Sequence, residues 1–143
     1  MSDDFSEVFK YLHKVETRLR EPSQFWRKSI AVLAESAKKT FNLQGRPGWK
    51  PRVSTKERHP ILDRTGRMRD SMEMTTGTRD AVVRITTSSR GGSLEKGTTV
   101  PYAKYHQVQG VGRTKTLRQF IDFYDTDADD IMQAGGDYFF PDH

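Results

Sequence analysis

The sequence contains no cysteine and no long apolar run. Without cysteine, the chain can form neither a disulfide framework nor a thiolate metal site. No apolar run approaches the roughly 20 residues that a membrane-spanning helix requires. The N-terminal stretch MSDDFSEVFK lacks the basic region and apolar run of a signal peptide. We therefore expect a soluble protein that is synthesised in a reducing cytoplasm.

Apolar residues are scarce overall. They make up 34% of the chain, and the mean hydropathy is -0.80. A chain of 143 residues is long enough for one domain, so we expect residues 1–143 to form a single domain. The composition predicts a small core, with part of the chain extended or resting on partners. Eight Phe, five Tyr and two Trp nevertheless argue against complete disorder.

The sequence also lacks the common motifs of catalysis and metal binding. It has no Gly-x-x-x-x-Gly-Lys-Ser/Thr phosphate loop and no Gly-x-Ser-x-Gly nucleophile elbow. His59, His106 and Asp63 could converge as metal ligands, but no two histidines stand at a ligand spacing. Asp63 and Asp70 could form a hydrolytic pair, but flanking arginines favour surface ion pairs for both. We therefore expect no enzyme, no catalytic or metal-binding residue and no cofactor.

Positive charge is missing from the C-terminal segment. All 24 Lys and Arg lie within residues 1–120, whereas residues 121–143 contain seven Asp and no Lys or Arg. An acidic tail of this kind can fold back on its own basic body, dock on the basic surface of a neighbouring copy, or repel competing polyanions. It can also be an ordinary solvated face. The docking interpretation gives four candidate residues: Asp125, Asp127, Asp129 and Asp130.

Residues 44–60, QGRPGWKPRVSTKERHP, predict a long irregular loop, because they contain two Gly and three Pro without an apolar period. Basic residues surround Trp49 in this loop, which suits phosphate contact combined with base stacking. A solubilising loop whose tryptophan packs into the core would have the same composition. Eight basic residues in and just after the loop are candidates for contact with DNA or a neighbouring subunit: Arg46, Lys50, Arg52, Lys56, Arg58, Arg64, Arg67 and Arg69.

Apolar periodicity predicts two helices, and capping residues indicate a third. The first lies within residues 1–22 and the second within residues 24–43, each with one apolar stripe. Residues 125–140 predict a final helix, capped by Asp125 or Thr126, whose acidic first turn suits the helix dipole.

β-prone residues indicate a small sheet. Residues 71–89 predict a hairpin whose turn is Gly-Thr-Arg-Asp at residues 77–80. We expect residues 90–100 to form a loop, residues 101–110 a short helical turn and residues 111–124 a further strand. The fold class is therefore α+β, with two N-terminal helices and a C-terminal helix packed on a small antiparallel β-sheet.

The segment PILDRTGRMRDSM, residues 60–72, predicts a sharp turn followed by a short helix. Thr65 and Gly66 supply a hydroxyl and a flexible backbone where the chain turns. Met68 and Met72 are four residues apart, so on a helix they share one face and can plug the core. The arginines of the segment are expected to project outward.

Four short motifs follow one another between the second and the last predicted helix. Their residues are Trp49 and Pro51; Leu62, Thr65, Gly66, Met68 and Ser71; Pro101, Tyr102, Ala103, His106 and Gln107; and Arg118 and Phe120. Together they resemble the virion-morphogenesis or tail-completion family of tailed bacteriophages, whose members in turn resemble neck and head–tail joining proteins. The resemblance covers roughly residues 25–140. The sequence departs from the family pattern at Met68 and Met72, which replace Leu and Ile, and at Thr116, which replaces Pro.

The motif residues are expected to be structural. In the third motif, we expect Tyr102 and Tyr105 to pack against the body of the protein. We expect His106 to be a buried histidine that bonds to the backbone, rather than a ligand or a catalytic base.

The resemblance implies a structural virion protein rather than an enzyme. Proteins of this kind sit where the DNA-filled head meets the tail, or cap the finished tail tube, often as a ring of six copies. The implied partners are further copies of the chain, other neck, connector and tail-tube proteins, and packaged double-stranded DNA through non-specific contact, with no membrane. The main alternative is a basic, sequence-independent nucleic-acid-binding module, and a small hydrolase is a more distant one.

Overall fold

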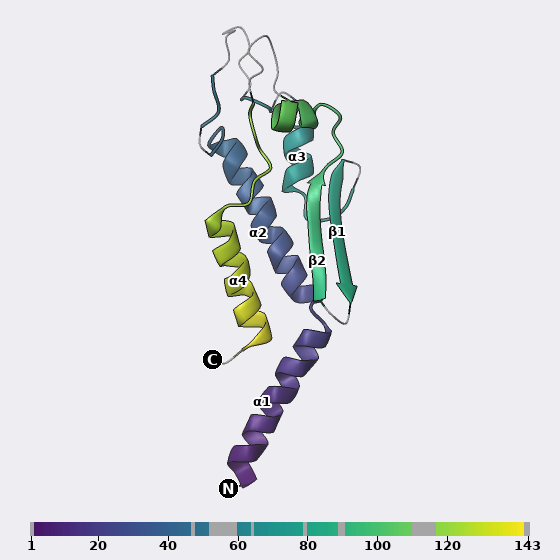
Figure 1. Ribbon diagram of the computed structural model, residues 1–143, viewed down its shortest axis with the longest axis vertical. Helices are drawn as coiled ribbons and strands as arrows, with labels where there is room; N and C mark the ends of the chain where they lie inside the picture. Colours follow the sequence, from purple (N-terminus) through teal and green to yellow (C-terminus); the bar gives the residue numbers. More distant parts are fainter. Residues whose placement is uncertain are drawn as a thin grey trace.

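The computed structural model describes residues 2–46, 48–51, 60–63, 65–78, 80–88, 91–109 and 117–141. The elements follow one another as α1 (Ser2–Arg20), α2 (Ser23–Asn42), α3 (Arg67–Glu73), β1 (Ala81–Ser88), β2 (Gly91–Thr98), the short π-helix η1 (Tyr105–Gln109) and α4 (Asp125–Phe139) (Figure 1). None of the helices within these ranges is both long and apolar enough to cross a membrane.

Strands β1 and β2 form a two-stranded antiparallel sheet, paired from Ala81 opposite Thr98 to Ser88 opposite Gly91. Helix α2 contacts β2, and α3 packs against α2 and both strands. Helix α4 packs along α2 (Figure 1). The α+β fold class predicted from the sequence is confirmed, with α2 as the long helix next to the sheet.

Helix α1 points away from the rest of the chain (Figure 1). Its C-terminal end is fastened to α4, because Arg18 Nη1 donates to the backbone oxygen of Tyr138 at 2.7 Å. The Arg18 guanidinium also lies over the Tyr138 ring, 5.1 Å from its centroid. The Tyr138 hydroxyl donates to the backbone oxygen of Glu21, between α1 and α2. The junction of α1 and α2 is therefore held against the end of α4.

The core lies where α2, α3 and the segments around η1 meet. Its buried members are Ala37, Phe41, Met68, Met72, Val100, Ala103 and Phe120, and Trp49 and Leu62 pack against them. Met68 and Met72 are 2% and 5% exposed, so their predicted role in the core is confirmed. The Trp49 ring meets the Phe41 ring edge-on at 5.7 Å, as the core-packing interpretation of the basic loop predicted.

The hairpin predicted at residues 71–89 is wrong in its pairing: residues 81–88 do form a strand, β1, but it pairs with the β2 residues that follow it and not with residues that precede it. Residues 71–73 belong to α3 rather than to a strand, and residues 91–98 form β2 rather than a loop. The helix prevails because Met68, Ser71 and Met72 recur at helical spacing and all three are buried. The eight residues of β2 contain only one large apolar side chain, Leu94, so they gave no strand signal.

The remaining differences lie near α4. Residues 117–124 form neither helix nor strand, so the strand predicted at 111–124 is wrong over that part, while residues 110–116 lie outside the described ranges. The N-cap of α4 is Tyr124 rather than Asp125 or Thr126. The backbone N of Tyr124 donates at 3.1 Å to Oδ2 of Asp127, which satisfies a backbone donor at the start of the helix.

Candidate functional site

The first and last sequence motifs bind each other. Trp49 Nε1 donates to the backbone oxygen of Gln119 at 2.8 Å. Arg118 Nε donates to the backbone oxygen of Lys50 at 3.0 Å, and its Nη2 donates to that of Pro51 at 3.4 Å. The Trp-x-Pro segment and the Arg-x-Phe segment are therefore joined directly, although they lie almost 70 residues apart in the sequence.

The third motif joins the same cluster through Gln107. Its Oε1 accepts hydrogen bonds from the backbone N of Phe120 at 2.9 Å and of Ile121 at 3.1 Å. Its Nε2 donates to the backbone oxygen of Ile121 at 2.7 Å. One glutamine side chain thus binds three backbone groups of Phe120 and Ile121, which form no strand, and it helps to hold Phe120 in the core.

The second motif shapes the entry to α3. Gly66 is the N-cap of this helix and has φ +77°, a left-handed conformation that favours glycine. Ser71 donates to the backbone oxygen of Met68 at 2.6 Å and is 2.7 Å from the Thr98 hydroxyl, which ties α3 to the end of β2. Each of the four motifs therefore contributes to one core: Met68, Ala103 and Phe120 are buried in it, and Trp49 and Leu62 pack against it.

The tyrosines and histidine of the third motif differ from expectation. Tyr102 and Tyr105 are exposed instead of packed, and Lys104 lies over the Tyr105 ring at 5.2 Å. His106 is half-buried, but its Nδ1 has no hydrogen-bond partner among the described residues. Burial and the nearby charge of Arg118 lower the pKa of His106. Its imidazole therefore favours the neutral form.

Arg46, a candidate for DNA contact, is bound inside the protein. Its Nη2 donates to the Ser36 hydroxyl at 2.6 Å and to the Ser36 backbone oxygen at 2.9 Å, and its Nε donates to the Thr40 hydroxyl at 3.1 Å. The guanidinium lies 3.8 Å from the centroid of the Tyr124 ring. Arg46 thus fastens the segment before α4 to α2.

Two further candidates, Arg67 and Arg69, have carboxylate partners. Arg67 makes two hydrogen bonds of 2.9 Å to Asp80, and this hydrogen-bonded ion pair raises the pKa of Arg67. Arg69 pairs with Glu73 at 2.7 Å and with Asp63 at 3.2 Å, and the hydrogen bond to Glu73 is the largest cause of its raised pKa. Asp63 is therefore an ion-pair partner.

The other basic candidates divide into two groups. Lys50 is exposed. Arg52, Lys56, Arg58 and Arg64 lie outside the described residues, as does His59.

The acidic candidates also divide. Asp125, Asp129 and Asp130 are exposed on α4. Asp127 is only 4% exposed and accepts a hydrogen bond from the Ser36 hydroxyl at 2.8 Å, so its carboxylate does not face a partner. The available acidic surface on α4 is smaller than the sequence predicted.

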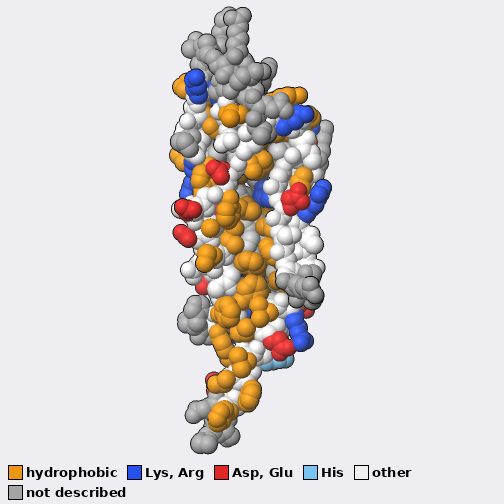
Figure 2. All heavy atoms as spheres, in the orientation of Figure 1, with side chains coloured by type: hydrophobic (Ala, Val, Ile, Leu, Met, Phe, Trp, Pro, Cys, Tyr) orange, Lys and Arg blue, Asp and Glu red, His pale blue; other side chains and the backbone are white. Residues whose placement is uncertain are grey.

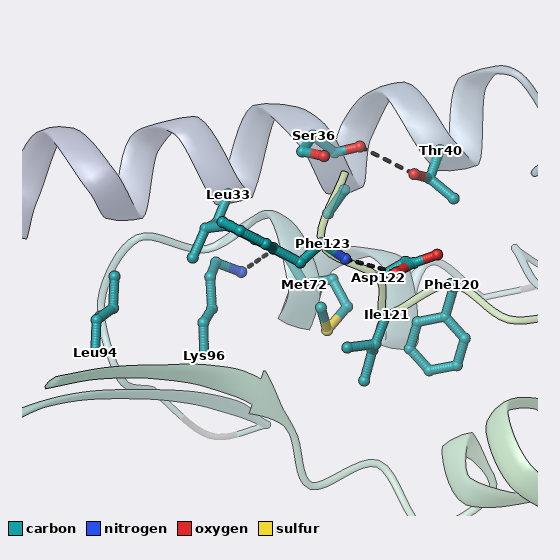
Figure 3. A pocket seen from close by; sticks show the side chains of 11 residues that line it. Leu33, Ser36, Thr40, Met72, Leu94, Lys96, Phe120, Ile121, Asp122 and Phe123 are labelled. Atoms are coloured by element: carbon teal, nitrogen blue, oxygen red, sulfur yellow. Dashed lines mark hydrogen bonds between the residues drawn. The ribbon is translucent and has the colours of Figure 1, made fainter. Parts of the chain in front are cut away.

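Sequence reasoning missed an apolar groove beside α2. A hollow of about 250 Å³ is lined by Leu33, Met72, Leu94, Phe123 and their neighbours. Leu94 and Lys96 point from β2 toward α2 in Figure 3, with Leu33 facing them. Lys96 Nζ donates to the backbone oxygen of Met72, and burial lowers the pKa of Lys96 to about 8. No local signal marks these residues, because they come together only through the fold.

Within the described part of the chain, no group of three or more His, Cys, Asp or Glu side chains could hold a metal ion. The two groups whose pKa is lowered, Lys96 and His106, lie in the apolar groove and in the third sequence motif, respectively.

Comparison with protein families gives a match. The model of the phage virion morphogenesis family matches residues 3–132. Comparisons with curated proteins and with solved structures found no match. The family match spans most of the chain, including all four motifs, and confirms the resemblance drawn from them. The protein is therefore a member of the phage virion morphogenesis family.

Proposed function

We propose that the protein completes the virion of a tailed bacteriophage at the head–tail junction, as a tail-completion, tail-terminator or neck component. The observation that carries this proposal is the family match over residues 3–132, combined with the use of the family motifs to build the core. In this proposal the motif residues build the core, and the outer surfaces contact the neighbouring virion proteins. In this role the protein acts without catalysing a reaction.

In this proposal the copies form a closed ring around the DNA channel. A head-to-tail contact between unlike faces closes into a ring when the rotation per subunit allows it. Six copies is the number that the family resemblance implies. Exposed Asp125, Asp129 and Asp130 provide an acidic face on a chain whose basic residues all lie elsewhere. The partners would be connector, neck and tail-tube proteins, and the protein would reside in the virion at the head-proximal end of the tail after synthesis in the host cytoplasm.

The test is a phage with an early stop codon in this gene, viewed by negative-stain electron microscopy. We expect full heads beside unattached tails, or tails of abnormal length, and restoration of normal particles by the intact gene supplied in trans. Tails of normal length would favour a neck position, whereas overlong tails would favour a terminator. Normal infectious particles from the stop-codon phage would contradict the proposal.

The alternative function is sequence-independent nucleic-acid binding by the single subunit, which the basic loop at residues 44–60 favours. Arg46, Arg67 and Arg69 have intramolecular partners, so fewer cations are available for phosphates than the sequence suggested. Titration of labelled duplex DNA at several salt concentrations separates the two functions. Tight binding by the monomer that weakens steeply with salt would favour the alternative.

A further inference from the structure

Helix α1 exposes an unpartnered apolar stripe. Phe5, Val8, Phe9, Leu12 and Leu19 are each more than half exposed, and Phe9 reaches 67%. These residues recur at intervals of three, four and seven, so they lie on one face of the helix. A stripe of this size on a projecting helix is the signature of a contact with another surface.

The body of the protein offers a groove of matching chemistry. Figure 2 shows apolar side chains in a band that runs from α1 along the face between α4 and the hairpin. Two hollows lie along α2 in this region. One is lined by Phe25, Trp26 and Phe139, and the other is lined by Leu33 and Phe123 among others. The hollow beside Trp26 is also lined by Leu19 and Arg20 of the chain's own α1, so the free groove is the one at Leu33 and Phe123. Its floor is α2, and its walls are β2 and residues 120–123, the segment before α4.

The free groove is long enough to accept two turns of a helix. The α2 residues that line it run from Leu33 to Thr40, a rise of about 10 Å at 1.5 Å per residue. The projecting part of the α1 stripe runs from Phe5 to Leu12, which is also about 10 Å. An amphipathic helix that lays such a stripe into an apolar groove is a recurrent mode of protein recognition.

The last turn of the chain's own α1 ends at the hollow beside Trp26, and the rest of α1 is directed away from the groove at Leu33 (Figure 1). Only Glu21 and Pro22 connect α1 to α2, and Glu21 N donates to Thr17 O, which continues the helical bonding of α1. Arg18 and Tyr138 then fasten the junction to α4. The occupant of the groove is therefore to be found on another molecule, and a second copy of this chain carries the matching stripe.

We propose that α1 of one copy lies in the groove along α2 of the next copy, with its apolar stripe against Leu33, Leu94 and Phe123. Each copy then has one stripe and one groove on different parts of its surface, so the contact is head-to-tail and can repeat until a ring closes. The inference rests on the proposed ring assembly and supplies the contact that forms it.

The test uses two full-length variants that each damage one face. The stripe variant carries Phe9→Ser and Leu12→Ser, and the groove variant carries Leu94→Ser and Phe123→Asp. Leu43→Ser is the control, because Leu43 is 59% exposed and belongs to neither surface. Molar mass is measured by light scattering after size-exclusion chromatography. We expect an oligomer for the unmodified chain and the control, and a mass of 16.5 kDa for each variant alone.

Mixing the two variants gives the sharpest result. The stripe variant retains an intact groove and the groove variant an intact stripe, so the mixture is expected to form a dimer and to stop there. A dimer also demonstrates that both variants are folded. If the groove variant alone still forms oligomers, the stripes pair with one another and the proposal is overturned. A monomeric unmodified chain would overturn the proposal too. Binding of that monomer to vesicles of anionic lipid through α1 would show that the stripe contacts a membrane instead of a second copy.

The failure of this inference is distinguishable from the failure of the proposed function. The stripe variant is also supplied in trans to the stop-codon phage. If the stripe variant restores normal particles and the stop-codon phage alone does not form them, the α1 contact is contradicted and the virion role is supported. If the variants oligomerise as expected in solution but the stop-codon phage still gives normal particles, the α1 contact is supported and the proposed virion role is contradicted.

Discussion

The Ser36 hydroxyl donates a hydrogen bond of 2.8 Å to Oδ2 of Asp127, a residue 91 positions further along the chain. The same hydroxyl accepts a hydrogen bond from Arg46 at 2.6 Å, and the same carboxylate oxygen accepts one from Tyr124 N at 3.1 Å. Both Ser36 and Asp127 are buried. This network fixes the start of α4 on α2, and with it one wall of the apolar groove.

Replacing Asp127 with Ala should destabilise the protein by about 2 kcal/mol. The change removes the acceptor for the Ser36 hydroxyl and for Tyr124 N, and buried donors without partners cost about 1–3 kcal/mol. Urea unfolding followed by circular dichroism measures the loss. Asp130→Ala, on the exposed side of the same helix, is the matched control and should change stability by less than about 0.5 kcal/mol. Equal effects of the two changes would show that the network contributes little.

Two glycines of β2 should differ sharply when replaced by alanine. A Cβ at Gly92 would lie 2.8 Å from Trp26 Cζ2 and 2.9 Å from the Thr86 backbone oxygen, whereas a Cβ at Gly97 would have no atom within 4 Å. Overpacking of this kind costs about 1–3 kcal/mol. We therefore expect Gly92→Ala to lower the midpoint of thermal unfolding clearly and Gly97→Ala to leave it unchanged or slightly raised. The same unfolding midpoint for both variants would refute the close approach of Trp26 to β2.

The sequence predicted the elements whose signal is local. Apolar periodicity indicated the positions of α1 and α2, and capping residues with an acidic first turn indicated α4. The four-residue spacing of Met68 and Met72 placed both in the core. Strand β2 was missed because its residues, GGSLEKGT, have low β-propensity. It exists because every residue pairs with β1, and because Gly92 leaves room for the Trp26 ring. That information is tertiary and is absent from the segment itself.

In the candidate site, too, some features could be predicted from the sequence and others depend on tertiary contacts. The motif residues were recognised in the sequence, but their function as one hydrogen-bonded core depends on contacts such as Arg118 with Lys50, which join distant segments. Arg46 was a candidate for DNA contact because it lies in the basic loop at residues 44–60. In the structure it binds Ser36, a partner that the sequence does not reveal. Lys96 gave no signal at all, since its environment is built by α2, α3 and β2 together.

Replacing Gln107 with Ala should cost about 2–3 kcal/mol in the free energy of unfolding. The side chain makes three hydrogen bonds to the backbone of Phe120 and Ile121, and each contributes about 1 kcal/mol. Chemical denaturation measures the loss. Gln119→Ala is the control, because among the described residues the Gln119 side chain makes a single long hydrogen bond, of 3.4 Å, to the Gln107 backbone oxygen. If the two changes cost the same, Gln107 does not hold the segment in place.

Lys96 should make the stability of the protein rise with pH in the alkaline range. Burial lowers the pKa of Lys96 from 10.5 to about 8, so between these values the unfolded chain binds a proton that the folded chain has released. Stability then increases with pH until both states are neutral. The difference between the two pKa values corresponds to about 3 kcal/mol. The side chain is only half-buried, so solvent screening reduces the expected gain to on the order of 1–2 kcal/mol.

The comparison of unfolding free energies at pH 7 and pH 10 for the unmodified chain and Lys96→Met isolates this contribution. Methionine keeps a long unbranched side chain and has no charge to lose. All other ionisable groups are common to both chains, including Glu73, whose charge opposes the lowering of the Lys96 pKa. The methionine variant should therefore show the smaller increase in stability with pH, and its largest advantage over the unmodified chain should appear at pH 7, where Lys96 is charged. A constant difference between the two chains from pH 7 to pH 10 would mean that Lys96 titrates as an ordinary surface lysine and that the groove around it is open to water.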